Sequence, residues 1–231
     1  MPLNYSSVTN EVYFLGGGGY AGVLAEECAV THDRLRGILD PQLTPGTKVG
    51  KICVLGGDSY LDSIDPESAV ALVNAIGASP NRTLRQDIFR KYIKKGFRFK
   101  TIVSASAVVQ ESVQLSQGVQ VLAGAVLQAN VKIGANSVIN TSTSIDHDCI
   151  IEEDCWISPG TTICGNVVIQ KGCYIGAGSI ILENVEIAYG SFIRAGSLVT
   201  KAFAKEIGEK KSVSIMPPSG TTGQKMTFDE S

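Results

Sequence analysis

The chain has 231 residues, of which 44% are hydrophobic, 18% charged and 6% aromatic. It can bury a sizeable core, and this composition excludes both a disordered chain and a membrane span. Its 20 Lys and Arg against 22 Asp and Glu give a formal charge of -2, without a long run of one sign. The charge pattern therefore predicts no nucleic-acid partner and no membrane insertion.

The cysteines and the N-terminus indicate a cytoplasmic protein. None of the six cysteines belongs to a C-x-x-C pair, and the N-terminal residues lack a basic segment followed by an apolar run of signal-peptide length. We therefore expect reduced thiols. The sequence has only two histidines, His32 and His147, which excludes a three-histidine metal site within one chain, and we expect no metal cofactor.

In residues 1–101, short β-rich runs alternate with helical stretches. This order predicts βαβ units around a parallel sheet, as in a Rossmann-like α/β domain. Strands are predicted at 12–15, 35–40, 51–55 and 69–76, and helices at 23–30 and 83–95. The second helix is amphipathic, and Leu84, Ile88, Tyr92 and Ile93 are its predicted apolar face.

A glycine-rich loop joins the first predicted strand to the first helix. Gly17, Gly19 and Gly22 match G-x-G-x-x-G, a pattern in which backbone N–H groups approach a diphosphate at the N-terminus of a helix. Asp40 ends the second strand, near the place where such folds hold a ribose with an acid. We predict phosphate binding here, although the sheet is too small for a full dinucleotide fold. The alternative is that the glycines only make a tight turn.

A six-residue period runs from Val103 to Val199. Every sixth residue is Val, Leu or Ile, and the residue three places later is Ser, Gly, Asn or Asp until the series ends at Ala202. One inward aliphatic residue, one inward small residue and one turn residue that tolerates left-handed φ describe a three-sided solenoid. We predict an all-β left-handed parallel β-helix over residues 102–202 and a C-terminal tail at 203–231.

The hexad pattern behind a small glycine-rich α/β domain resembles the hexapeptide-repeat acyltransferases, and within them the bacterial nucleotide-sugar N-acetyltransferases. The likeness is carried by GILD ending the second strand, VLGGD after the third, AIGASPNR after the fourth and SIDHDC in the solenoid. These enzymes, such as the UDP-N-acetylbacillosamine N-acetyltransferases, acetylate an amino group of a nucleotide-linked dideoxy sugar. The resemblance implies acetyl-CoA as co-substrate, a nucleotide-linked amino sugar as substrate, and a homotrimer with its active sites at the subunit clefts.

His147 is the candidate general base. It is the only histidine in the solenoid, and it follows the inward Ile145 by two residues, which predicts a corner position that faces outward. Attack of an amine on a thioester is best assisted by a base with a pKa near 7. The resemblance identifies Asp148 as the acid that holds the imidazole, with Asp146 as the alternative. Asp148 also belongs to the series of turn residues, so the other possibility is that it only forms the corner.

The resemblance also assigns contacts to both substrates. For acetyl-CoA they are Trp156, Gly165, Ala177 and Ala195. For the nucleotide sugar they are Gly17, Gly18, Gly19, Tyr20, Asp40, Gly56, Gly57 and Asp58. The backbone N–H of Gly165 would serve as an oxyanion donor. Tyr20 and Trp156 stand where relatives often carry histidine, and the alternative for Trp156 is an exposed aromatic on a flat side.

Three classes of function compete. The leading one is N-acetyl transfer to a nucleotide-linked amino sugar, at C4, for which UDP, GDP and dTDP sugars are all candidates. The second is O-acetyl transfer to a sugar or serine-type hydroxyl, which the predicted phosphate-binding loop disfavours. The third is a non-catalytic trimeric binding module, which the outward His147 between Ala129 and Gly165 disfavours.

Overall fold

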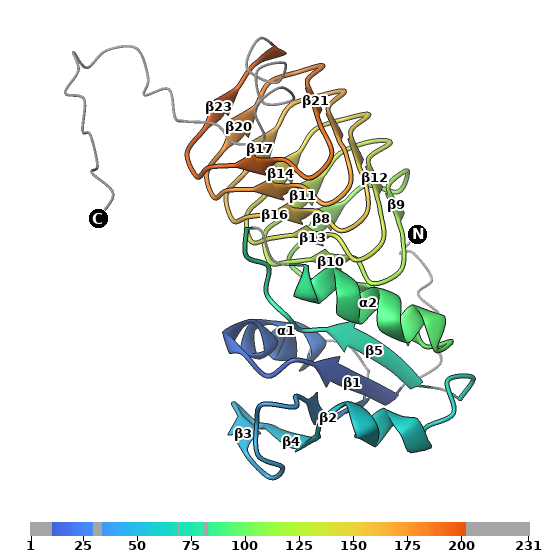
Figure 1. The fold of residues 1–231 in the computed structure, drawn as a ribbon. Helices are drawn as coiled ribbons and strands as arrows, with labels where there is room; N and C mark the ends of the chain where they lie inside the picture. The colour runs from blue at the N-terminus through green and yellow to red at the C-terminus, as the bar shows by residue number, and fades with distance from the viewer. Residues whose placement is uncertain (1–10, 30–33, 69, 81–82, 202–231) are drawn as a thin grey trace, which may run out of the picture.

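A computed structural model describes residues 11–29, 34–68, 70–80 and 83–201. An α/β domain comes first along the chain, and a three-sided stack of short parallel strands follows it (Figure 1). Helix α2 (Leu84–Lys94) lies between the two. The predicted tail at 203–231 lies outside the described residues.

The N-terminal sheet has six strands in the order β3-β4-β2-β1-β5-β6. The pairings are parallel except that between β3 and β4. The strands are β1 (Glu11–Leu15), β2 (Arg34–Leu39), β3 (Lys48–Val49), β4 (Ile52–Gly56), β5 (Val70–Asn74) and β6 (Arg98–Phe99). Helix α1 (Gly19–Ala29) follows β1, and a 3-10 helix, η1 (Asp58–Ser63), follows β4. The predicted Rossmann-like order is confirmed.

Both helices differ in detail from their predictions. Helix α1 begins at Gly19 rather than at residue 23, because glycine is a weak helix former that still fits the first turn of a helix. In α2 the predicted apolar face is partly wrong: Leu84 is 57% exposed, whereas Arg85 and Phe89 are buried. The helix is packed on two sides, and the Phe89 ring lies 4.5 Å from that of Phe99. Neither helix, nor any other in the described ranges, is long and apolar enough to cross a membrane.

The solenoid has three flat sides made of two-residue strands that pair in parallel with the strand one coil away. The first side comprises β7 (Ile102–Val103), β10 (Gln120–Val121), β13 (Val138–Ile139), β16 (Trp156–Ile157), β19 (Tyr174–Ile175) and β22 (Phe192–Ile193). The second side comprises β8 (Val108–Val109), β11 (Val126–Leu127), β14 (Ser144–Ile145), β17 (Thr162–Ile163), β20 (Ile180–Ile181) and β23 (Leu198–Val199). The third side comprises β9 (Gln114–Leu115), β12 (Lys132–Ile133), β15 (Ile150–Ile151), β18 (Val168–Ile169) and β21 (Glu186–Ile187).

The six-residue pattern acts as predicted. The periodic aliphatic residues fill one continuous core or pack against it, together with inward small residues such as Cys149 and Cys173. Each turn residue of the series from Gly118 to Gly196 has a φ between 57° and 72°. Left-handed φ is the region that Gly tolerates best and that Asn and Asp enter more readily than other residues. The left-handed β-helix is therefore confirmed.

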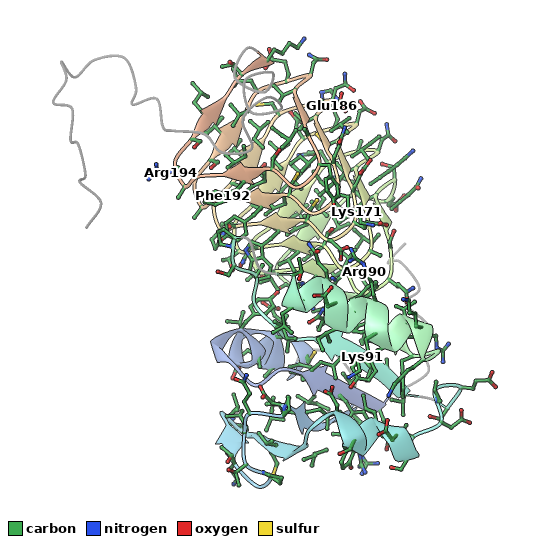
Figure 2. The ribbon with its side chains drawn as sticks, in the orientation of Figure 1. Arg90, Lys91, Lys171, Glu186, Phe192 and Arg194 are labelled. Carbon is green, nitrogen blue, oxygen red and sulfur yellow. The ribbon has the colours of Figure 1, made fainter. Side chains whose placement is uncertain are left out.

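The N-terminal domain covers the first side of the solenoid as far as Trp156, and the corner between the third and first sides. The outward residues Gln120, Val138 and Trp156 of the first side are buried. At the corner, the Arg90 guanidinium donates from α2 to the Asp154 carboxylate at 2.9 Å, and Figure 2 shows Arg90 where the helix meets the coils. The corner between the second and third sides, which carries residues 146–149, therefore lies on the opposite flank of the solenoid.

Candidate functional site

His147 and Asp148 form a hydrogen-bonded pair at the corner between the second and third sides. Nδ1 of His147 lies 2.8 Å from Oδ2 of Asp148, and the His147 side chain is 58% exposed. Asp146 accepts a hydrogen bond from the backbone N–H of His147 at 2.8 Å, so it fixes the turn rather than the ring. The geometry therefore favours Asp148 over Asp146 as the partner of the imidazole.

The position of Gly165 leaves room for the imidazole. A Cβ built on Gly165 would lie 2.7 Å from Nε2 of His147, which is closer than real Cβ contacts come. Since Nδ1 is engaged by a carboxylate, the neutral ring carries its proton on Nδ1, and Nε2 keeps its lone pair. The pair can therefore accept a proton at Nε2, beside the backbone of Gly165.

Charge and hydrogen bonding tune both members of the pair. The hydrogen bond to Asp148 raises the pKa of His147 above its usual value, and the nearby charge of Asp146 adds to this effect. Hydrogen bonds from Asn130 and His147 lower the pKa of Asp148. The carboxylate therefore stays ionised where the imidazole titrates, as a partner that orients and stabilises an imidazolium must.

A separate cavity of about 510 Å³ lies in the N-terminal domain, at the ends of the parallel strands. Five predicted contacts line it, and they are Gly18, Gly19, Tyr20, Asp40 and Asp58. Its other walls come from the loops after β2 and β5 and from α2. Ligands of open α/β sheets bind at this edge, where loops from neighbouring strands meet.

The glycine loop is held open by Asp40. The Gly17 N–H donates to one carboxylate oxygen and the Gln42 N–H to the other, each at 2.8 Å. A Cβ at Gly18 or Gly19 would meet nothing within 4 Å, so free space lies above the first turn of α1. This space, at the N-terminus of a helix, suits a phosphate.

The predicted contacts that follow β4 do not all lie at the cavity. Gly56 and Gly57 do not line the cavity; the Gly56 carbonyl instead accepts the Asp40 N–H at 2.8 Å. Asp58 forms an ion pair with Lys91 of α2, which Figure 2 places toward the N-terminal sheet. Lys91 therefore places a positive charge next to Asp58, near a cavity for which no basic contact was predicted.

Trp156 lies at the junction of the two domains. It is 9% exposed, its ring centroid lies 5.1 Å from that of Tyr20 in an edge-on arrangement, and the Arg85 guanidinium lies 5.8 Å from the ring. The alternative of an exposed aromatic is wrong, because the N-terminal domain covers this part of the solenoid. The assignment of Trp156 to acetyl-CoA stays a prediction.

A buried polar network surrounds that tryptophan. Arg85 donates to the carbonyls of Asn74 and Ile76 at 2.7 and 2.9 Å, and to the side-chain carbonyl of Gln120 at 3.2 Å. The Tyr20 hydroxyl donates to the same Gln120 oxygen at 2.7 Å. Burial lowers the pKa of Arg85 to about 10, which still leaves it charged at neutral pH. Tyr20 thus lines the cavity, and its ring and hydroxyl also contact the solenoid.

Ala177 and Ala195 lie at the corner between the first and second sides, after β19 and β22. Gly165 and His147 lie at the next corner, after β17 and β14. Within one chain the structure therefore joins His147, Asp148 and Gly165, but not the two alanines. The described residues include no group of three His, Cys, Asp or Glu side chains that could hold a metal ion.

Several residues of these sites were missed by the sequence analysis. The loop after β5, with Ala75, Ile76 and Gly77, lines the cavity. Because β1 pairs with β5 in parallel, this loop lies next to the glycine loop, and the order of the strands could have predicted this contact. Asn130 contacts Asp148, and their separation of 18 residues, which is one coil of the solenoid, could have predicted the contact. Arg85 gave no signal, because a helical arginine is usually solvated.

Comparisons with known proteins match this fold. The family profile "Bacterial transferase hexapeptide (six repeats)" matches residues 148–183. The chain is similar to a mutant perosamine N-acetyltransferase of Caulobacter crescentus solved with CoA and GDP-perosamine, at 30% identity over 85% of this chain and 91% of that chain, with a TM-score of 0.76. Comparison with curated protein sequences gives no match.

Two further solved structures are similar. The acetyltransferase domain of PglB from Neisseria gonorrhoeae, in complex with acetyl coenzyme A, is 28% identical over 84% of this chain and 92% of that chain, with a TM-score of 0.77. WeeI from Acinetobacter baumannii is 24% identical over 84% of this chain and 92% of that chain, with a TM-score of 0.69. The second supports the fold alone.

The titration of His147 tests the geometry of the pair. In the wild-type protein we expect an imidazole pKa above the usual value of about 6.5. Asp148→Asn should lower it clearly, and Asp146→Asn should lower it less, because Asp146 acts on the ring only through its charge. Two-dimensional NMR of the imidazole nitrogens gives the values, and His32 is the only other histidine signal. An unchanged His147 pKa in Asp148→Asn would contradict the pairing.

Proposed function

The chain belongs to the nucleotide-sugar N-acetyltransferases of the hexapeptide-repeat family, and we propose that His147 is the general base with which it acetylates the C4 amine of a nucleotide-linked amino-dideoxy sugar. It is an acetyltransferase that uses acetyl-CoA. The observation that carries the role of His147 is the imidazole whose Nδ1 is held by Asp148 and whose Nε2 faces the space left by Gly165.

The reaction needs one proton acceptor and one site for negative charge. The sugar amine attacks the thioester carbonyl, and as the C–N bond forms, Nε2 of His147 takes the amine proton. Asp148 stabilises the resulting imidazolium through Nδ1. Collapse of the tetrahedral intermediate breaks the C–S bond, and the imidazolium returns its proton to the departing CoA thiolate, which restores the neutral base. The backbone N–H of Gly165 is the proposed donor to the oxyanion.

The cavity in the N-terminal domain is the proposed site for the nucleotide sugar. Its volume of about 510 Å³ suits a ligand of this size. The diphosphate would lie over Gly18 and Gly19, at the N-terminus of α1, where no side chain blocks the backbone. We propose residues 1–101 as the nucleotide-sugar domain and residues 102–202 as the acetyl-CoA domain.

The active site is proposed to form between subunits of a homotrimer. In one chain the cavity lies on the flank of the first side, whereas His147 lies at the opposite corner, so the solenoid separates them. The second side, next to His147, presents Val108, Ile180 and Leu198 at 44% to 52% exposure. A second copy seated against this apolar side would both bury it and bring its own groups to the imidazole. None of the six cysteines forms a disulfide in the described residues, and reduced thiols fit a cytoplasmic location.

The proposed function predicts an acetylated product for the wild-type enzyme and a loss of turnover for a variant without His147. Incubation with acetyl-CoA and a panel of UDP-, GDP- and dTDP-linked 4-amino sugars should yield one N-acetylated product, detected by mass spectrometry. His147→Ala should lower kcat for that substrate by about 10²-fold or more, since general-base catalysis contributes that much. Sedimentation checks that the assembly is unchanged. Near wild-type turnover in His147→Ala would contradict the assignment.

Gly19→Val tests the site of the nucleotide sugar. The added side chain would occupy the free space above the first turn of α1, where the diphosphate is proposed. Loss of close approach to charged phosphate oxygens should raise the KM for the nucleotide sugar about tenfold or more. The KM for acetyl-CoA should change little. Equal increases in both constants would mean that the loop serves the donor.

Mixing the two variants tests whether the site forms between subunits. Each subunit of His147→Ala retains an intact cavity, and each subunit of Gly19→Val retains an intact imidazole. After joint refolding in equal amounts, about a quarter of the sites should combine both intact halves, with that share of wild-type activity at low sugar concentration. The unmixed variants, refolded in the same way, are the controls. Activity that never exceeds their mean would place both halves in one chain.

A further inference from the structure

The corner that carries His147 also carries a ladder of polar turn residues. Successive coils place Ser112, Asn130, Asp148, Asn166 and Asn184 at equivalent positions of the six-residue series. The Asn130 N–H donates to the Ser112 hydroxyl at 2.9 Å, and the Asn166 amide donates to that of Asn184 at 2.7 Å. Asp148 is the single acid in this ladder.

The two carboxylate oxygens of Asp148 have different partners. The Asn130 side-chain N–H donates to Oδ1 at 2.9 Å, and Oδ2 lies 2.8 Å from Nδ1 of His147. A carboxylate held at one oxygen presents the other in a fixed direction. From this geometry we infer that Asn130 is a positioning residue, which holds Asp148 in the rotamer that orients the catalytic imidazole.

The exposure of the pair shows why such a residue is needed. The side chains of His147 and Asp148 are 58% and 51% exposed, so within the chain they are not packed into place. The hydrogen bond from Asn130 is also the largest cause of the lowered pKa of Asp148, because an amide donor stabilises the ionised carboxylate. The backbone N–H of Asn130 is in turn held by the hydroxyl of Ser112, one coil earlier.

The backbone at this position allows a clean test. Asn130 has a φ of 63°, and glycine, which has no Cβ penalty there, occupies many turn positions of the same series. Asn130→Gly therefore removes the amide and keeps the turn. Asn184→Gly is the matched control, since Asn184 has a φ of 57° in the same ladder and contacts Asn166 instead of Asp148.

The inference rests on the proposed role of His147 and predicts a loss in kcat. We expect Asn130→Gly to lower kcat between about tenfold and 10²-fold, with little change in either KM, because a small misplacement of a catalytic group costs that much. Asn184→Gly should keep kcat near the wild-type value. In an Asp148→Asn background, Asn130→Gly should have no further effect, because the two residues act in series.

A second measurement is independent of activity. The pKa of His147, measured by NMR, should fall in Asn130→Gly and stay at the wild-type value in Asn184→Gly. If His147→Ala keeps its turnover, the proposed function fails, while the NMR result still decides the positioning. An unchanged kcat and pKa in Asn130→Gly, equal losses in the control, or additive losses with Asp148→Asn would overturn the inference.

Discussion

The left-handed turn at each corner is the constraint on which this structure depends. A turn residue with φ near 60° recurs every six residues, and each coil therefore returns to the same three corners. Residues 18 apart stack directly above one another, as the hydrogen bond from Asn130 to Asp148 shows. The corner conformation also restricts the residue type to Gly, Asn, Asp or Ser. A carboxylate can thus occupy such a corner with no change of backbone, and Asp148 does so.

The difference between what the sequence predicted and what it missed has a physical basis. The solenoid, its core and the outward corner of His147 follow from local rules, because each hexad specifies its own side and turn. The pairing of Asp148 with the imidazole could be expected from adjacency and family likeness. The junction could not, because Arg85 and Gln120 are buried only when two separately specified units meet. Leu84 was misplaced for the same reason, since α2 packs on both units.

The two halves of the proposed chemistry have unlike environments. The cavity is preformed by strand ends, a helix N-terminus and the Asp40 carboxylate, which is itself held by two backbone N–H groups. The proposed base lies on an exposed corner, where hydrogen bonds rather than packing fix it. If the site forms between subunits as proposed, the neighbouring subunit would exclude water from the imidazole.

The buried network around Arg85 has a consequence for substrate choice. Because its guanidinium is tied to both units by hydrogen bonds and stands over the Trp156 ring, the N-terminal domain and the solenoid cannot slide past each other without breaking several buried contacts. In a symmetric assembly, the span from the loop of one subunit to the imidazole of another is then constant. For the proposed site between subunits, the junction would therefore select sugars by the distance between the diphosphate and the amine.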